Sequence, residues 1–169
     1  TQPNEQPSLQ PTEIVTVAPA LKPSSSPMTQ LQSSALELVP DEEIVSHDSL
    51  KNLAIHGNTA VVGAPHNDNK RGFVLVYVKD DNDKWLQQAK LVAPDGAAGD
   101  LFGWSVGVHG DTVIVGAYGD DDNGSDSGSA HVFVRDGVTW THLAKLVAPD
   151  GAASDWFGRS VGIYGDTLV

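Results

Sequence analysis

The chain lacks several features that would point to common functions. None of its 169 residues is cysteine, which excludes a disulfide framework and thiolate chemistry. Its 10 lysines and arginines are outnumbered by 22 aspartates and glutamates, and the formal net charge is −12. Such a surface repels phosphate backbones, so no nucleic-acid partner is expected. No run approaches the roughly 18 apolar residues of a membrane-spanning helix, so no transmembrane segment is expected in this chain.

Glycine and aromatic residues are absent from residues 1–43, whereas the rest of the chain holds all 17 glycines and every Trp, Tyr and Phe. Without large side chains, these first residues cannot offset the entropy lost on ordering, and their Pro, Ser, Thr and Gln content predicts a disordered tail or linker. In a secreted protein this tail would suit an extended spacer or an O-glycosylated stalk. A disordered leader without a role of its own is the alternative.

Residues 44–169 contain a long internal repeat. The stretch KLVAPDGAAGDLFGWSVGVHGDTV begins at Lys90, and KLVAPDGAASDWFGRSVGIYGDTL begins fifty-five residues later at Lys145. A repeat of this length is typical of one supersecondary unit that stacks on its neighbours, because a single copy cannot bury its apolar face alone.

Each complete copy predicts four antiparallel strands joined by glycine and aspartate turns, which is the blade of a β-propeller. In one copy the apolar runs predict strands at Ser105–His109, Thr112–Ala117, Ala130–Arg135 and roughly Trp140–Val147. The preceding copy predicts strands at Ala60–Ala64, Phe73–Lys79 and Trp85–Leu91. We therefore expect an all-β, incomplete propeller, with blade one at about 44–91, blade two at 92–147 and a partial blade three at 148–169.

The motifs Phe102-Gly103 and Phe157-Gly158, with Gly116-Ala117 following the first, resemble the FG-GAP family, the blade unit of the integrin α-chain propeller. An earlier Gly63-Ala64-Pro65 completes the second half of the motif, although Ser49-Leu50 stand where Phe-Gly would be. The glycines would permit close approach of neighbouring blades, which the phenylalanines would seal. This resemblance implies a propeller fold and further blades of the same protein, but no particular activity.

A separate acidic loop, Asp120 to Asp126, lies between the predicted second and third strands of blade two. The calcium loop of integrin-like blades lies one connection earlier and is too short here to be carried over. Because carboxylates crowded in a glycine-rich loop favour a hard divalent cation, we expect Ca²⁺ to be bound here. A solvated turn is the competing interpretation, and Asn123-Gly124-Ser125 is also an N-glycosylation sequon. The candidate ligands are Asp120, Asp121, Asp122, Asn123 and Asp126.

No nucleophile, base and orienting group are recognisable together, and the six histidines form no ligand cluster, so an enzyme is not expected. The sequence favours an extracellular or cell-surface binding or adhesion module, in which the loops of one propeller face recognise a protein or glycan ligand. An accessory propeller of a larger secreted enzyme and a structural repeat without a ligand remain alternatives.

Overall fold

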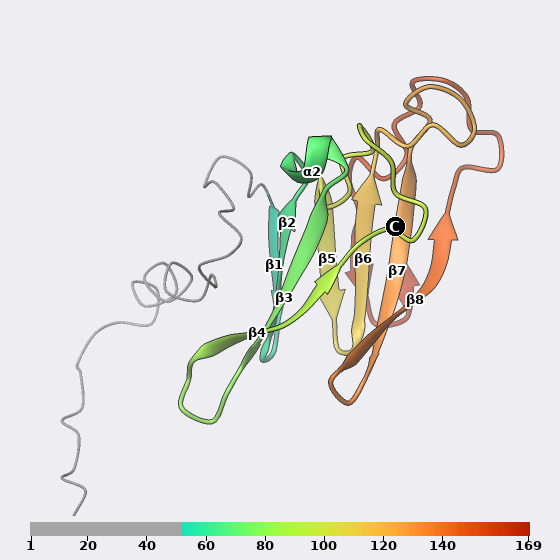
Figure 1. The fold of residues 1–169 in the computed structure, drawn as a ribbon. Coiled ribbons are helices and arrows are strands. Elements are labelled where there is room, and N and C mark those ends of the chain that lie inside the picture. Colours follow the sequence, from blue (N-terminus) through green and yellow to red (C-terminus); the bar gives the residue numbers. More distant parts are fainter. Residues whose placement is uncertain (1–51) are drawn as a thin grey trace, which may run out of the picture.

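A computed structural model describes residues 52–169, and the predicted tail at residues 1–43 lies outside this range. Two four-stranded antiparallel sheets stand side by side, each with its strands in chain order (Figure 1). The sheet of blade one contains β1 (Asn52–His56), β2 (Thr59–Ala64), β3 (Phe73–Lys79) and β4 (Trp85–Leu91). The sheet of blade two contains β5 (Ser105–His109), β6 (Thr112–Ala117), β7 (Ser129–Asp136) and β8 (Thr139–Leu146).

These sheets confirm the predicted all-β class and the propeller-blade architecture. β7 is one residue longer at each end than the predicted third strand of blade two, and β8 lies one residue earlier than the predicted fourth strand. β2 begins one residue earlier than predicted, at Thr59. The continuous run Val113-Ile114-Val115 is buried on both faces of its sheet, as a central strand requires. The segment labelled α2 (Asn67–Lys70) is a left-handed turn, because Asp68, Asn69 and Lys70 all have positive φ.

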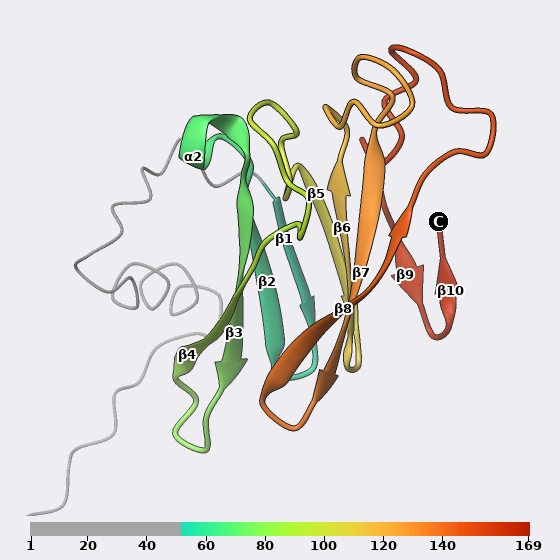
Figure 2. The same ribbon diagram turned by 45° about the vertical axis from the view of Figure 1, so that its right-hand side comes forward.

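A third, partial unit packs against blade two. It contains the hairpin β9 (Ile163–Tyr164) and β10 (Thr167–Leu168), and β9 contacts β5. Figure 2 shows this hairpin on the side of blade two that faces away from blade one. A side chain at Gly107 of β5 would touch Ile163, so the partial unit approaches blade two closely. This hairpin lies within residues 148–169, where the sequence predicts a partial third blade.

The main apolar core lies between blades one and two. Phe102 is fully buried there, and its ring meets the edge of the Phe133 ring at a centroid distance of 6.0 Å. Trp140 packs against this core, and its Nε1 donates a hydrogen bond to Oε1 of Gln88 in blade one (2.8 Å). The buried members of the core are Val61, Val74, Val76, Leu91, Ala93, Phe102, Val108, Val113, Val115, Ala117 and Phe133.

The Phe-Gly motif of each repeat contacts the blade before it. Phe102 N–H donates to the carbonyl of Arg71 (3.0 Å), and Gly103 lies against Gly63 so closely that a Cβ on Gly63 would overlap the Gly103 carbonyl oxygen. The next repeat forms the same contact between Gly158 and Gly116. The expected close approach at these glycines is thus observed in both copies.

We predict that Gly63→Ala lowers the free energy of unfolding by about 3 kcal/mol, because a methyl group would collide with backbone that cannot rotate away. Urea denaturation followed by circular dichroism measures the change. Gly57→Asn is the matched control, since Gly57 has nothing within 4 Å of a Cβ and its φ of 57° is tolerated by Asn. A Gly63→Ala variant as stable as this control would contradict the steric account.

Candidate functional site on the loop face

The loops that join the second to the third strand, and the fourth strand to the next blade, emerge at one end of the sheets (Figure 2). We call this end the loop face. The two kinds of loop touch: Ser154 N–H donates to the Ser125 carbonyl (2.8 Å), and Trp156 N–H donates to the Asp126 carbonyl (3.1 Å). The alternating strand directions therefore collect residues from successive repeats on one surface.

Lys145, on β8, is the cation around which the acidic loop gathers, although no local sequence pattern marks this role. It lies on β8 opposite His131, and its ammonium is 2.8 Å from Asp95, 2.7 Å from Asp120 and 2.5 Å from Asp122. Asp95 belongs to the connection that follows blade one, whereas Asp120 and Asp122 belong to blade two. The Lys145 cluster, which we define as these four residues, therefore fastens the connection between the blades to the loop and the last strand of blade two.

Electrostatics hold the Lys145 cluster in its charged state. Burial alone would lower the pKa of Lys145, but the hydrogen bonds to Asp120, Asp122 and Asp95 outweigh it and raise that pKa above its ordinary value. Burial alone would likewise raise the pKa of Asp120, yet Lys145 and the N–H of Asp122 hold it below the usual range. The ammonium thus compensates much of the charge that the acidic loop concentrates.

The five candidate calcium ligands do not converge on one point. Asp120 and Asp122 bind Lys145, while Asp121 Oδ1 accepts the N–H of Asp126 (2.7 Å). Asn123 N–H donates to the Ser127 hydroxyl (3.2 Å), so the loop also closes on itself as a turn. Within residues 52–169, no group of three or more His, Cys, Asp or Glu side chains is arranged to hold a metal ion. Calcium binding at this loop stays a prediction, and it would require displacement of Lys145.

A buried polar chain extends inward from Asp120. The Ser129 hydroxyl donates to Asp120 Oδ2 (2.8 Å) and lies 3.3 Å from His131 Nε2, while His131 Nδ1 lies 3.1 Å from His142 Nε2. Because the ionised Asp120 only accepts, Ser129 accepts from His131 Nε2–H, and His131 Nδ1 then accepts from His142. The structure therefore pairs two histidines that looked scattered in the sequence, since β7 and β8 are neighbours.

His131 is fully buried, and its ring meets the Phe102 ring edge to face at a centroid distance of 5.4 Å. Burial is the main cause that lowers the pKa of His131 to about 4. Neither Ser129 nor His131 is exposed, so their contact serves the packing of blade two and is not accessible to a substrate.

A hollow of about 490 Å³ opens on the loop face at the junction of all three units. Trp104 and Tyr118 meet edge to face at a centroid distance of 4.8 Å, and Trp156 is exposed beside Arg159, whose guanidinium lies 5.1 Å from its ring. The hollow is also bordered by Lys70 and Asp126. We call it the aromatic pocket, defined by Trp104, Tyr118, Trp156, Arg159, Lys70 and Asp126.

Sequence reasoning did not assign the aromatic pocket, but a signal was present. Trp104 and Arg159 are equivalent positions in two copies, and Tyr118 stands where the earlier copy has Pro65. Positions that differ between otherwise identical repeats are not required for the blade fold, so their residues can form a specific site.

The fold defines the class of protein: stacked four-stranded antiparallel sheets, each fastened to the last by a Phe-Gly contact, are blades of an incomplete β-propeller. Residues 85–133 and 140–169 match the FG-GAP repeat family. These stretches are FG-GAP repeats, as the motif resemblance implied. No curated protein matches the chain by sequence. Within the described part of the chain, no helix has the length and apolar character needed to cross a membrane.

We predict that Lys145→Met lowers the free energy of unfolding by about 3 kcal/mol, because the buried Asp120 carboxylate would lose its counter-charge. The midpoint of urea denaturation measures the loss. Lys79→Met is the control, since among residues 52–169 Lys79 forms an ion pair only with the exposed Asp83. Its removal should change stability by less than about 0.5 kcal/mol. Equal midpoints for the two variants would show that the Lys145 cluster does not stabilise the blades.

We predict that stability falls as the pH is lowered from about 6.5 to about 4. The folded pKa of His131 is below that of an unfolded histidine, so the unfolded state binds more protons in this interval. The loss is about 3 kcal/mol at the acid end of the interval. Asp120 and Asp95, whose pKa values are lowered, contribute only at still lower pH.

The control variant for this pH dependence is His131→Leu. Leucine is the residue that blade one has at the equivalent position, Leu75. Urea midpoints measured from pH 4 to 7 should then change much less with pH than those of the unchanged chain. An identical pH dependence in both proteins would refute the assignment to His131.

Proposed function

We propose that this chain is part of an extracellular or cell-surface binding module that recognises a protein or glycan on its loop face. The aromatic pocket is the observation that carries the proposal. The exposed ring of Trp156 and the half-buried rings of Trp104 and Tyr118 offer large apolar faces at low entropic cost. Arg159, Lys70 and Asp126 supply hydrogen-bonding and charged groups at the rim. Such a combination is typical of recognition sites.

Binding fits the chain better than catalysis. FG-GAP repeats occur in integrin-like propeller proteins and form a structural or binding family. The one Ser and His contact in the described region is buried between sheets, and the groups around the aromatic pocket include no paired nucleophile and base. The chain therefore supports a ligand-binding role, with adhesion as its specific form.

Calcium dependence is a separate part of the proposal. The acidic loop borders the aromatic pocket through Asp126, so a cation bound there would reposition this side of the pocket. Lys145 already pairs with Asp120 and Asp122 and offsets part of their charge, so a cation would have to compete with this ammonium.

We predict that Trp156→Ala weakens ligand binding by about tenfold or more, because it removes an exposed aromatic anchor. The probes are a glycan array and a panel of extracellular-matrix proteins, each screened with calcium and with a chelator. Binding at the pocket should also quench tryptophan fluorescence. Tyr164→Ala is the control, since Tyr164 is an even more exposed ring on the β9–β10 hairpin, outside the aromatic pocket. Equal weakening by both substitutions, or by neither, would argue against this site.

A further inference from the structure

The aromatic pocket carries two cations that have no carboxylate partner among residues 52–169. Lys70 and Arg159 are exposed at its border, and neither side chain forms an ion pair within this part of the chain. The Arg159 guanidinium instead lies 5.1 Å from the Trp156 ring, and such a contact does not occupy its N–H donors as a carboxylate would. In a chain of net charge −12, these two cations favour an anionic group of a ligand at this place.

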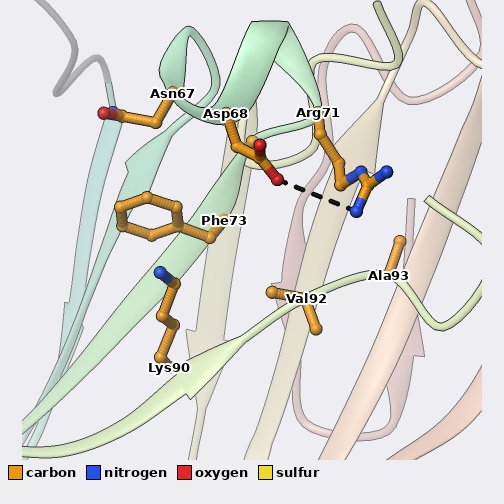
Figure 3. Close-up of a pocket in the computed structure, with 8 residues that line it drawn as sticks. Asn67, Asp68, Arg71, Phe73, Lys90, Val92 and Ala93 are labelled. Atoms are coloured by element: carbon orange, nitrogen blue, oxygen red, sulfur yellow. Dashed lines mark ion pairs between the residues drawn. The ribbon is translucent and has the colours of Figure 1, made fainter. Parts of the chain in front are cut away.

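A second hollow, of about 480 Å³, contains basic groups that already have partners. It lies on blade one between α2 and the end of β4 (Figure 3). Arg71 forms an ion pair there with Asp68 at 3.7 Å, and the Lys90 ammonium lies 4.0 Å from the centre of the Phe73 ring (Figure 3). The aromatic pocket therefore differs from this hollow in offering cations that a ligand can pair.

The backbone around the aromatic pocket is the same in two successive repeats. Leu101 N–H donates to the Lys70 carbonyl (2.8 Å), as Trp156 N–H does to the carbonyl of Asp126. All four residues have a positive φ, which residues other than glycine keep only where their surroundings hold them. This repeated frame fixes the positions of a lysine and a leucine in one repeat, and of an aspartate and a tryptophan in the next.

The groups that meet in the aromatic pocket match a sugar acid. Trp156 offers a flat apolar surface to the C–H face of a pyranose ring. Arg159 and Lys70 can donate charge-assisted hydrogen bonds to a carboxylate. The Asp126 carboxylate accepts hydrogen bonds, which suits the hydroxyl groups of a sugar. The volume of about 490 Å³ falls within the range of roughly 300 to 1,000 Å³ that is typical of small-ligand sites.

We propose that the ligand of the aromatic pocket is an acidic saccharide, a pyranose that carries a carboxylate, as in a uronic acid. This inference rests on the proposed recognition function of the same pocket and names its ligand class. The sugar ring stacks on Trp156, and its hydroxyl groups donate to Asp126. Its carboxylate binds Arg159 and Lys70.

The charges and the rigid rings of the pocket favour this ligand over two other anions. An acidic peptide presents its carboxylate on a flexible side chain and loses more entropy on binding than a sugar ring does. A densely sulfated polymer is repelled by Asp126 and by the net charge of −12. A ligand with one carboxylate on each rigid ring avoids both costs.

Titration of the full chain with matched saccharides tests the proposal. The probes are trisaccharides of galacturonate, glucuronate and mannuronate, each paired with its carboxyl-reduced form, in which a CH₂OH group replaces the carboxylate. Tryptophan fluorescence measures the affinity. At least one acid form should bind about tenfold or more tightly than its reduced partner, because only the acid form accepts charge-assisted hydrogen bonds. We predict that Arg159→Gln removes most of this difference, whereas Trp156→Ala weakens the binding of both forms.

Arg71→Gln is the matched control, since Arg71 is also an exposed arginine of the loop face but does not border the aromatic pocket. It should leave both affinities unchanged. Equal affinities for the acid and reduced forms, both weakened by Trp156→Ala, would overturn the acidic ligand and leave recognition at the pocket intact. Binding of a glutamate-rich peptide that depends on Arg159, with no saccharide bound, would overturn it in favour of a protein partner. If no saccharide, peptide or matrix protein binds through Trp156, the proposed function fails as well.

Discussion

The contact between Gly103 and Gly63, repeated between Gly158 and Gly116, is the constraint on which the arrangement of the blades depends. At both places the backbones approach more closely than any side chain would permit. This approach anchors the connection between blades and carries Phe102 into the shared core. It also lays the connection over the loop of the preceding blade, where Ser154 and Trp156 bond to it. The loop face is thus a consequence of the same contact that builds the core.

The arrangement of the blades also determines where the charged side chains of the acidic loop meet their counter-ion. Asp95, Asp120 and Asp122 would repel one another if they met alone, but the connection brings them to Lys145, whose stem is anchored on β8. In such a partly buried cluster, the lysine gives the acidic loop a fixed conformation. The strong negative charge of the chain is therefore compatible with an ordered loop at this point.

Most of the fold could be predicted from the sequence, because the alternation of apolar and polar residues and the internal repeat both reflect the local requirements of strands and turns. The limits of β3, β4, β5 and β6 agree with the apolar runs in the sequence. The site could not be predicted in the same way. Lys145 on β8 reaches Asp120 in the loop before β7 and Asp95 in the connection after β4, and His131 meets His142 only through the pairing of β7 with β8. Contacts between residues distant in sequence leave no local pattern. The sequence therefore shows that the loop is acidic, but it does not show that Lys145 is the counter-ion.

The two blades also explain where polarity is tolerated. At positions where blade one has Phe73 and Leu75, blade two has Ser129 and His131, yet both sets are buried. The polar pair is stable because it continues into Asp120 and His142, so its donors and acceptors are satisfied. Blade one has Asn67 in place of Asp120, and apolar residues there need no such chain. The buried histidine and the acidic loop therefore form one unit. The loop carboxylate that binds Lys145 also orients Ser129, which fixes the tautomer of the neutral His131 ring.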